Sequence, residues 1–183
     1  MNAPDRSGRV FWTTAAAVIA LDVVSKILIV RWLEPYQLPH RVIGSVVRFA
    51  LAYNPGAAFS MSLGRYQRWL FGAFAAIALI IVWRLYQSWR LHRSTPGRDL
   101  ARVLSLGLIW GGAAGNLIDR VRSPRGVVDF IDIGIGDVRF WTFNVADSAV
   151  SIGAVILAYV LWRDDRDTAR AAAATSEAQS ATK

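Results

Sequence analysis

Apolar residues along this chain gather into four blocks that are separated by polar stretches. We expect these blocks to form helices over residues 10–30, 67–85, 101–118 and 143–162. A helix needs about 20 predominantly apolar residues to cross the hydrocarbon core of a bilayer. The uncharged part of the second block, 69–83, reaches that length if the arginines beside it snorkel to the headgroups. The pattern therefore predicts an all-α membrane protein with four transmembrane helices, in a single domain over residues 1–170.

The first block has an alternative interpretation as a cleavable signal peptide, because Arg6 and Arg9 precede its apolar run. The run is too long for such a segment, and no small-residue cleavage motif follows it. We therefore expect an uncleaved first helix.

The two longer connections carry strand patterns. Between residues 47 and 53 apolar side chains occupy every second position, which is the period of a β-strand. Residues 127–133 and 138–143 flank a Gly-Ile-Gly-Asp turn at 134–137, which predicts a β-hairpin. A small extracytoplasmic β-sheet is therefore expected to form a cradle on the outer ends of the helices.

Composition narrows the chemistry. The formal net charge is +8, but the arginines flank apolar runs, which suits lipid headgroups better than nucleic acid. There is no cysteine, so disulfides, thiolate chemistry and cysteine-bound metals are excluded. His40 and His92 stand alone, outside any metal-ligand spacing, and we interpret both as loop residues.

The distribution of basic residues favours cytoplasmic termini. Eleven Lys and Arg residues lie in the N-terminal tail, the 84–102 connection and the C-terminal tail, against nine in the other two connections. Residues 171–183 are rich in Ala, Ser and Thr without an apolar period. This composition predicts a disordered cytoplasmic tail.

Two charged residues interrupt the first apolar block. Asp22 and Lys26 are spaced i, i+4 and so share one face of the helix. They could form a buried ion pair that pins a neighbouring element, or they could belong to a proton path or substrate site. Spacing alone favours the structural role.

A polar motif, Asn54-Pro55-Gly56-Ala57-Ala58-Phe59-Ser60, follows the first predicted strand. Asn-Pro-Gly readily forms a turn. Small residues beside an amide could equally let the backbone approach a ligand, and the sequence leaves both interpretations open.

The third block ends in Gly111-Gly112-Ala113-Ala114-Gly115-Asn116-Leu117-Ile118-Asp119-Arg120. Its small residues permit close helix packing. Asn116 and Arg120 share a face where the helix leaves the membrane, so Arg120 could be a headgroup anchor or could hold a carboxylate or carbonyl.

Asp129 and Asp147 are the strongest candidates for chemistry. If the predicted hairpin pairs residue 134 with 137, Asp129 lies opposite residue 142, and Asp147 follows in the first turn of the last helix. Two carboxylates that share a site hold one proton between them, so one can act as a base and the other as an acid. The alternative is that Asp147 caps the helix and Asp129 is a solvated charge.

Taken together, these motifs resemble the lipoprotein signal peptidase (signal peptidase II) family of bacterial aspartyl membrane proteases. The resemblance rests on five blocks in the family's order, extending from Asp22 to about Gly153. It implies catalytic roles for Asp129 and Asp147. It further implies pocket roles, binding substrate or supporting the site, for Asn54, Gly56, Ala58, Asn116, Arg120, Asn144, Ala146, Asp22 and Lys26.

The resemblance also implies an activity, namely cleavage of a prolipoprotein before its diacylglyceryl-modified cysteine. It implies neither metal nor cofactor, and an active site facing outward from the bacterial inner membrane. We expect lipidated prolipoproteins and membrane lipids as partners, no nucleic acid, and a monomer. A small proton- or ion-coupled transporter and a non-enzymatic scaffold are the alternatives, although no sequence repeat of the kind found in transporters is visible.

Overall fold

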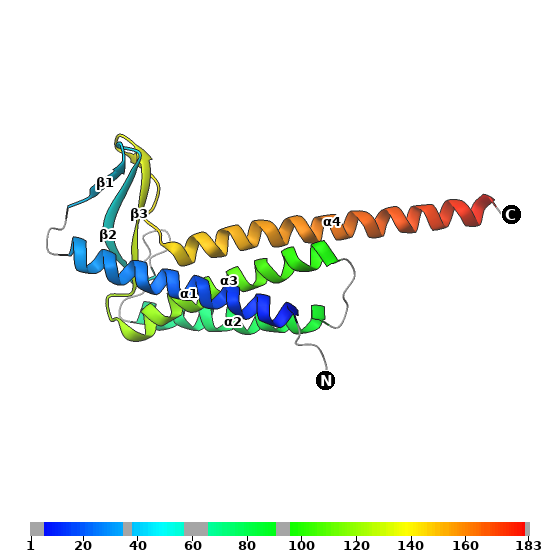
Figure 1. Cartoon of the computed structure of the whole chain (residues 1–183), viewed down its shortest axis with the longest axis horizontal. Coiled ribbons are helices and arrows are strands. Elements are labelled where there is room, and N and C mark those ends of the chain that lie inside the picture. Colours follow the sequence, from blue (N-terminus) through cyan, green and yellow to red (C-terminus); the bar gives the residue numbers. More distant parts are fainter. Residues whose placement is uncertain (1–5, 35–37, 57–65, 91–95, 182–183) are drawn as a thin grey trace.

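The computed structural model describes residues 6–34, 38–56, 66–90 and 96–181. The helices are α1 (Arg6–Leu33), α2 (Gln67–Arg90), α3 (Pro96–Arg122) and α4 (Val145–Ala181). The strands are β1 (His40–Ile43), β2 (Val47–Asn54), β3 (Val127–Ile135) and β4 (Val138–Arg139). The helices run side by side, and the sheet lies at the end where α1 finishes and α4 begins (Figure 1).

All four described helices are long and apolar enough to cross a membrane, which confirms the predicted membrane fold. Their outward faces carry exposed apolar side chains such as Leu21, Ile80 and Val155. Half of the most apolar window of α3 is buried, against 17–28% for the other three helices. α3 is therefore the central helix, and it packs against each of the others.

The helices extend beyond the predicted apolar spans, because the ends of a helix that reach water need not be apolar. The clearest difference is at the C-terminus, where α4 continues as a helix to Ala181. The sequence predicts disorder for residues 171–183, whereas residues 171–181 continue α4 in the structure. Alanine has the highest helix propensity, and lengthening an existing helix avoids the cost of nucleation.

The sheet is antiparallel, with strand order β1-β2-β3-β4. Its β3–β4 hairpin pairs Gly134 with Arg139, two residues away from the predicted register. β4 is also shorter than predicted, and an isolated bridge from Ile131 to Phe143 continues the pairing. His40, expected in a loop, begins β1, a four-residue strand too short to show a period in the sequence.

Apolar side chains pack in two places. One cluster lies toward the far end of the bundle and contains Phe11, Val82, Tyr86, Val103 and Leu106. The other joins Ile29 and Leu33 of α1 to Phe130 of β3, with Phe49, Leu51 and Val145 around them. This second cluster fixes β3 against the end of α1 and so positions the strand that carries Asp129.

Candidate active site

The first turn of α4 is held by a reciprocal cap. The Asn144 Oδ1 atom accepts a hydrogen bond from the Asp147 backbone N–H (2.9 Å), and the Asp147 carboxylate accepts one from the Asn144 N–H (3.2 Å). Asp22 reaches over from α1 and accepts the next free N–H, that of Ala146 (3.0 Å). Helix N-termini leave such donors unpaired, and they favour negative charge. Asp147 therefore lies in the first turn as predicted, while Asn144 is the capping residue.

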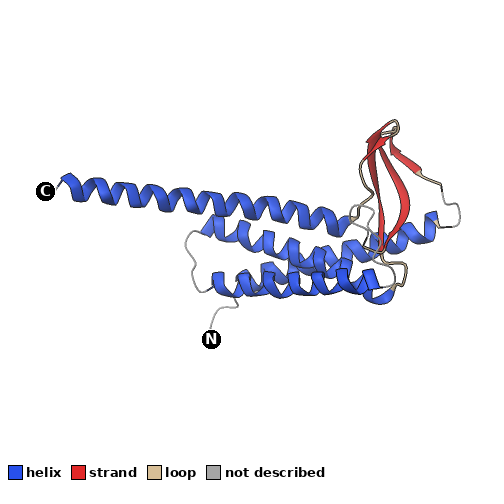
Figure 2. Cartoon of the chain, turned by 180° about the vertical axis from the view of Figure 1, so that it is seen from behind, coloured by secondary structure: helices blue, strands red, loops and turns tan. Residues whose placement is uncertain are grey.

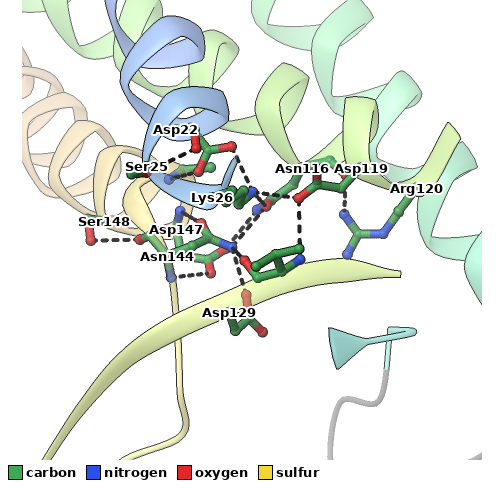
Figure 3. Close-up of polar contacts among 12 residues, drawn as sticks. Asp22, Ser25, Lys26, Asn116, Asp119, Arg120, Asp129, Asn144, Asp147 and Ser148 are labelled. Carbon is green, nitrogen blue, oxygen red and sulfur yellow. Dashed lines mark hydrogen bonds and ion pairs between the residues drawn. The ribbon is translucent and has the colours of Figure 1, made fainter. Parts of the chain in front are cut away.

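Asp129 lies within β3 beside this helix end (Figure 3). One of its carboxylate oxygens accepts a hydrogen bond from the Asn144 side chain (2.7 Å), and the other accepts one from Asn54 (3.2 Å). Its exposed fraction is only 4%. Burial is the largest cause that raises the pKa of Asp129, and the nearby charge of Asp147 is the second. The hydrogen bonds from Asn54 and Asn144 lower the pKa, but the net result is a pKa of about 6. Asn144 thus contacts both aspartates.

The turn after β2 holds Asn54 in place. Its side-chain oxygen accepts the Gly56 N–H (2.8 Å), which leaves the amide NH₂ group to face Asp129. Gly56 has φ +110°, and a Cβ atom there would lie 2.3 Å from the Phe71 ring. No other residue fits this position without strain. The motif is therefore a turn and also an Asp129 contact. Ala58 lies outside the described residues.

Lys26 is buried at the centre of the cluster, and its ammonium group contacts three acceptors. It donates to Asp22 (2.7 Å), Asp119 (2.9 Å) and the Asn116 side-chain oxygen (3.1 Å). Because an ammonium can only donate, the Asn116 oxygen must face Lys26 and its NH₂ group must face away. That NH₂ group donates to Asp147 (2.7 Å). Asp22 and Lys26 are thus a buried ion pair, and they also orient a neighbour of Asp147.

Close helix packing makes room for this ion pair. A Cβ atom added at Gly115 would lie 2.7 Å from the Asp22 carboxylate. Ala146 is fully buried on the facing helix. The small residues predicted to permit helix contact therefore permit a polar contact as well.

Asp119 belongs to the cluster but was not singled out as a site residue. It is 1% exposed and pairs with Lys26 (2.9 Å) and with Arg122 (2.8 Å). It also accepts the N–H of Val128, the residue before Asp129 (3.3 Å). Asp119 directly precedes Arg120 in the sequence motif, which is the one sign in the sequence that it belongs to the site. The spacing of residues does not show that β3 folds back onto Asp119.

Arg120 projects from α3 toward the same cluster (Figure 3). One of its terminal nitrogens donates to the Asn116 carbonyl (3.1 Å). It lies close enough to Asp147 and Asp129 to interact with both electrostatically. Its buried Nε atom has no hydrogen-bond partner among the described residues. Arg120 therefore adds positive charge beside both carboxylates.

The charges of the cluster do not balance. Its carboxylates are Asp22, Asp119, Asp129 and Asp147, and its cations are Lys26, Arg120 and Arg122. One proton on a carboxylate would restore neutrality, and the raised pKa of Asp129 favours this residue as the site of the proton. In the part of the chain that the structure describes, no three His, Cys, Asp or Glu residues meet where they could hold a metal ion.

Four membrane helices, with one carboxylate on the sheet beside another at a helix N-terminus, have the architecture of a membrane-embedded enzyme. Comparison with known proteins specifies the class. The family described as "Signal peptidase (SPase) II" matches residues 14–163. A lipoprotein signal peptidase of Mycolicibacterium smegmatis is 44% identical over 90% of this chain, which spans 66% of that protein's length. One of Pseudomonas fluorescens is 37% identical over 90% of this chain and 95% of its own.

A solved bacterial membrane enzyme, determined by the in meso method at 2.3 Å resolution, superposes with a TM-score of 0.70 at 28% identity. The match covers 86% of this chain and 90% of that one. The chain belongs to the signal peptidase II family. The four apolar helices and the bacterial relatives support an inner-membrane protein of a bacterium, and the family supports a protease.

Proposed function

We propose that this protein is an aspartic endopeptidase that removes signal peptides from prolipoproteins, cutting on the N-terminal side of the diacylglyceryl-modified cysteine. The observation that carries the proposal is the pair Asp129 and Asp147, both bonded to Asn144 in a cluster that lacks one positive charge. The relatives named above act on lipoproteins, as their name states.

The two aspartates have different surroundings and therefore different roles. Asp147 accepts hydrogen bonds on both oxygens, from Asn116 and from the Asn144 backbone N–H, in the first turn of α4, and we assign it the role of base. Asp129, with its raised pKa, holds the shared proton. Asp147 takes a proton from water while that water attacks the scissile carbonyl carbon, and Asp129 gives its proton to the carbonyl oxygen.

Collapse of the tetrahedral intermediate completes the reaction. The C–N bond breaks, the amine takes the proton held by Asp147, and Asp129 recovers its proton from the hydroxyl that becomes the new carboxylate group. No atom beyond water and peptide is needed.

Membrane geometry supports a lipidated substrate. The cluster lies where α1 ends and α4 begins, at one face of the membrane, so acyl chains in the bilayer would bring the cysteine of the substrate to this level. We assign this face to the outside and both termini to the cytoplasm, in line with the distribution of basic residues. We expect the protein to work as a monomer among membrane lipids.

The transporter alternative needs a lysine and an aspartate that exchange protons. Lys26 instead has all three ammonium hydrogens engaged by acceptors in a fully buried cluster. This arrangement holds the helices together, and we do not assign it a role in transport.

The test is a cleavage assay in detergent or vesicles with a synthetic precursor that carries diacylglycerol on its cysteine. We expect cleavage before that cysteine and far slower cleavage of the same peptide without the lipid. Cleavage should persist in a strong chelator, because carboxylates activate the water. Loss of activity on chelation, with recovery on added zinc, would overturn the aspartic mechanism. Absence of any cleavage would overturn the substrate assignment.

A further inference from the structure

The end of the sheet farthest from the helices is unusually apolar. We call it the sheet tip, and it consists of Ile43, Val46, Ile133, Ile135, Val138, Phe140 and Trp141. The exposed fractions of Ile135, Val138 and Trp141 are 76%, 82% and 74%. Scattered exposed apolar residues are ordinary, but a contiguous group marks an interaction surface.

The direction of the sheet shows which surface it can meet. The strands run across the direction of the helices and reach sideways beyond α4 (Figures 1 and 2). Because the helices cross the membrane, the sheet runs roughly parallel to the membrane plane. Its tip therefore overhangs lipid beside the bundle.

Neighbouring residues place the tip at the level of the headgroups. Trp32, near the end of α1, and Trp69, near the start of α2, are 44% and 55% exposed at the same end of the bundle. Exposed tryptophan at the end of a membrane helix marks the interface between lipid and water. Trp141 and Phe140 add two aromatic side chains on the sheet, farther from the helices, and their ring centroids are 6.0 Å apart.

The charges around the tip suit a bilayer surface. Asp132 is neutralised by Arg48 (2.6 Å) and Arg139 (2.8 Å), so this acid does not repel anionic lipid. Asp137, in the turn between Ile135 and Val138, is exposed and adds one negative charge at the tip. Arg41, on β1, adds a further exposed positive charge. Segments that lie in the headgroup region typically combine arginine with aromatic and aliphatic side chains.

We propose that the sheet tip inserts into the headgroup region of the bilayer on the side of the candidate active site. The tip then anchors the sheet at a second point, away from the helices, and holds β3 with Asp129 at a fixed depth. This proposal concerns the lipid surface and is independent of the proposed activity.

The absence of cysteine permits a direct test. The variants Val138→Cys and Ile135→Cys each give one site for a nitroxide label, at positions so exposed that the label disturbs little packing. Pro124→Cys, in the exposed α3–β3 loop at the same end of the bundle, is the matched control. The labelled proteins are placed in vesicles of phosphatidylcholine and phosphatidylglycerol, and relaxation of the label by oxygen and by a water-soluble nickel chelate is measured.

We expect the tip labels to be relaxed more by oxygen and less by nickel than the label at 124. Nickel accessibility at 135 and 138 equal to that at 124 would overturn the proposal. Shielding accompanied by dipolar coupling between labels on different molecules would also overturn it, because a second copy of the chain would then cover the tip. Measurement of the same samples at increasing lipid dilution separates these results. None of them depends on peptide cleavage.

Discussion

Two polar clusters join α3 to α4, one at each end of the bundle, and they differ in their charge balance. At the end away from the sheet, Arg98 lies between Asp164 (3.0 Å) and Asp167 (2.7 Å), and Arg102 also pairs with Asp164. Two cations face two carboxylates, and most of these side chains are partly exposed. At the end beside the sheet the side chains of Asp22, Lys26 and Asp119 are almost fully buried, and carboxylates outnumber cations.

The comparison distinguishes a structural clamp, the cluster around Arg98 and Asp164, from a reactive cluster around Lys26. Matched charges at a water-exposed helix end hold two helices together and have no spare group for chemistry. A buried surplus of carboxylate raises the pKa of one acid toward neutral pH, and a proton that can move is what acid–base catalysis needs. Both clusters contain Asp and Arg, so residue type alone does not distinguish them.

The largest expected effect comes from removal of either member of the carboxylate pair. Asp129→Asn and Asp147→Asn should each lower the rate of precursor cleavage by about 10³-fold or more, because the dyad loses its base or its acid. Asp132→Asn is the matched control. It lies three residues along the same strand, but it pairs with Arg48 and Arg139, which outweigh its burial and lower its pKa.

We expect Asp132→Asn to keep most of the activity. Purified Asp129→Asn or Asp147→Asn protein that still cleaves a lipidated precursor at a substantial rate would exclude the dyad. Thermal unfolding of each variant in detergent shows whether it is folded.

The second effect concerns stability at the two ends. Asp22→Ala strands the Lys26 ammonium beside Asp119 and frees the Ala146 N–H, so the free energy of unfolding should fall by about 3 kcal/mol or more. Asp167→Ala, at the end away from the sheet, removes a pair whose side chains are 32% and 40% exposed, and should cost about 0–1 kcal/mol. Thermal midpoints in one detergent compare the two variants.

Equal losses in Asp22→Ala and Asp167→Ala would contradict the distinction between clamp and reactive cluster. The swapped double variant Asp22→Lys/Lys26→Asp should not recover the stability, because it would place a carboxylate against Asp119 and an ammonium against the Ala146 N–H. An Asp22→Ala protein as stable as the parent but inactive would give Asp22 a direct role in the reaction.

The smallest expected effect is on the pH dependence. The pKa of Asp129 is raised from 3.8 to about 6, so kcat/KM should fall above about pH 6 as the dyad loses its shared proton. It should fall again in acid, once both carboxyls are protonated. A profile of kcat/KM from acid to alkaline pH checks both limbs, and a rate unchanged from pH 5 to pH 8 would contradict the shared proton.

The same pKa affects stability, with a defined sign. Between pH 4 and pH 7 the folded protein binds more protons than the unfolded chain, because its Asp129 has the higher pKa. Relative to Asp129→Asn, the parent should therefore lose about 2–3 kcal/mol of stability as pH rises through that window. Unfolding of both proteins at several pH values measures the difference, and parallel curves would show that the pKa is not raised.

Several features were determined by the sequence alone. The four apolar blocks predict the helices, since burial in lipid depends on the composition of each segment and not on its neighbours. The alternation over residues 47–53 predicts most of β2, and the Gly-Ile-Gly-Asp turn predicts the β3–β4 hairpin. Asn54, Asn116 and Asp147 could be selected because polar groups at membrane depth are costly and need a reason.

Only the tertiary structure decided which of these groups meet. Asp119 joins Lys26 to the backbone of Val128 through contacts between α1, α3 and β3, which no local spacing encodes. The two-residue shift of the hairpin depends on how β3 pairs and packs, and it brings Asn144 beside Asp129. The pKa of Asp129 follows from that packing, since burial and the neighbouring charge of Asp147 raise it. Composition fixes where each segment resides, but long-range contacts fix the electrostatic environment of each carboxylate.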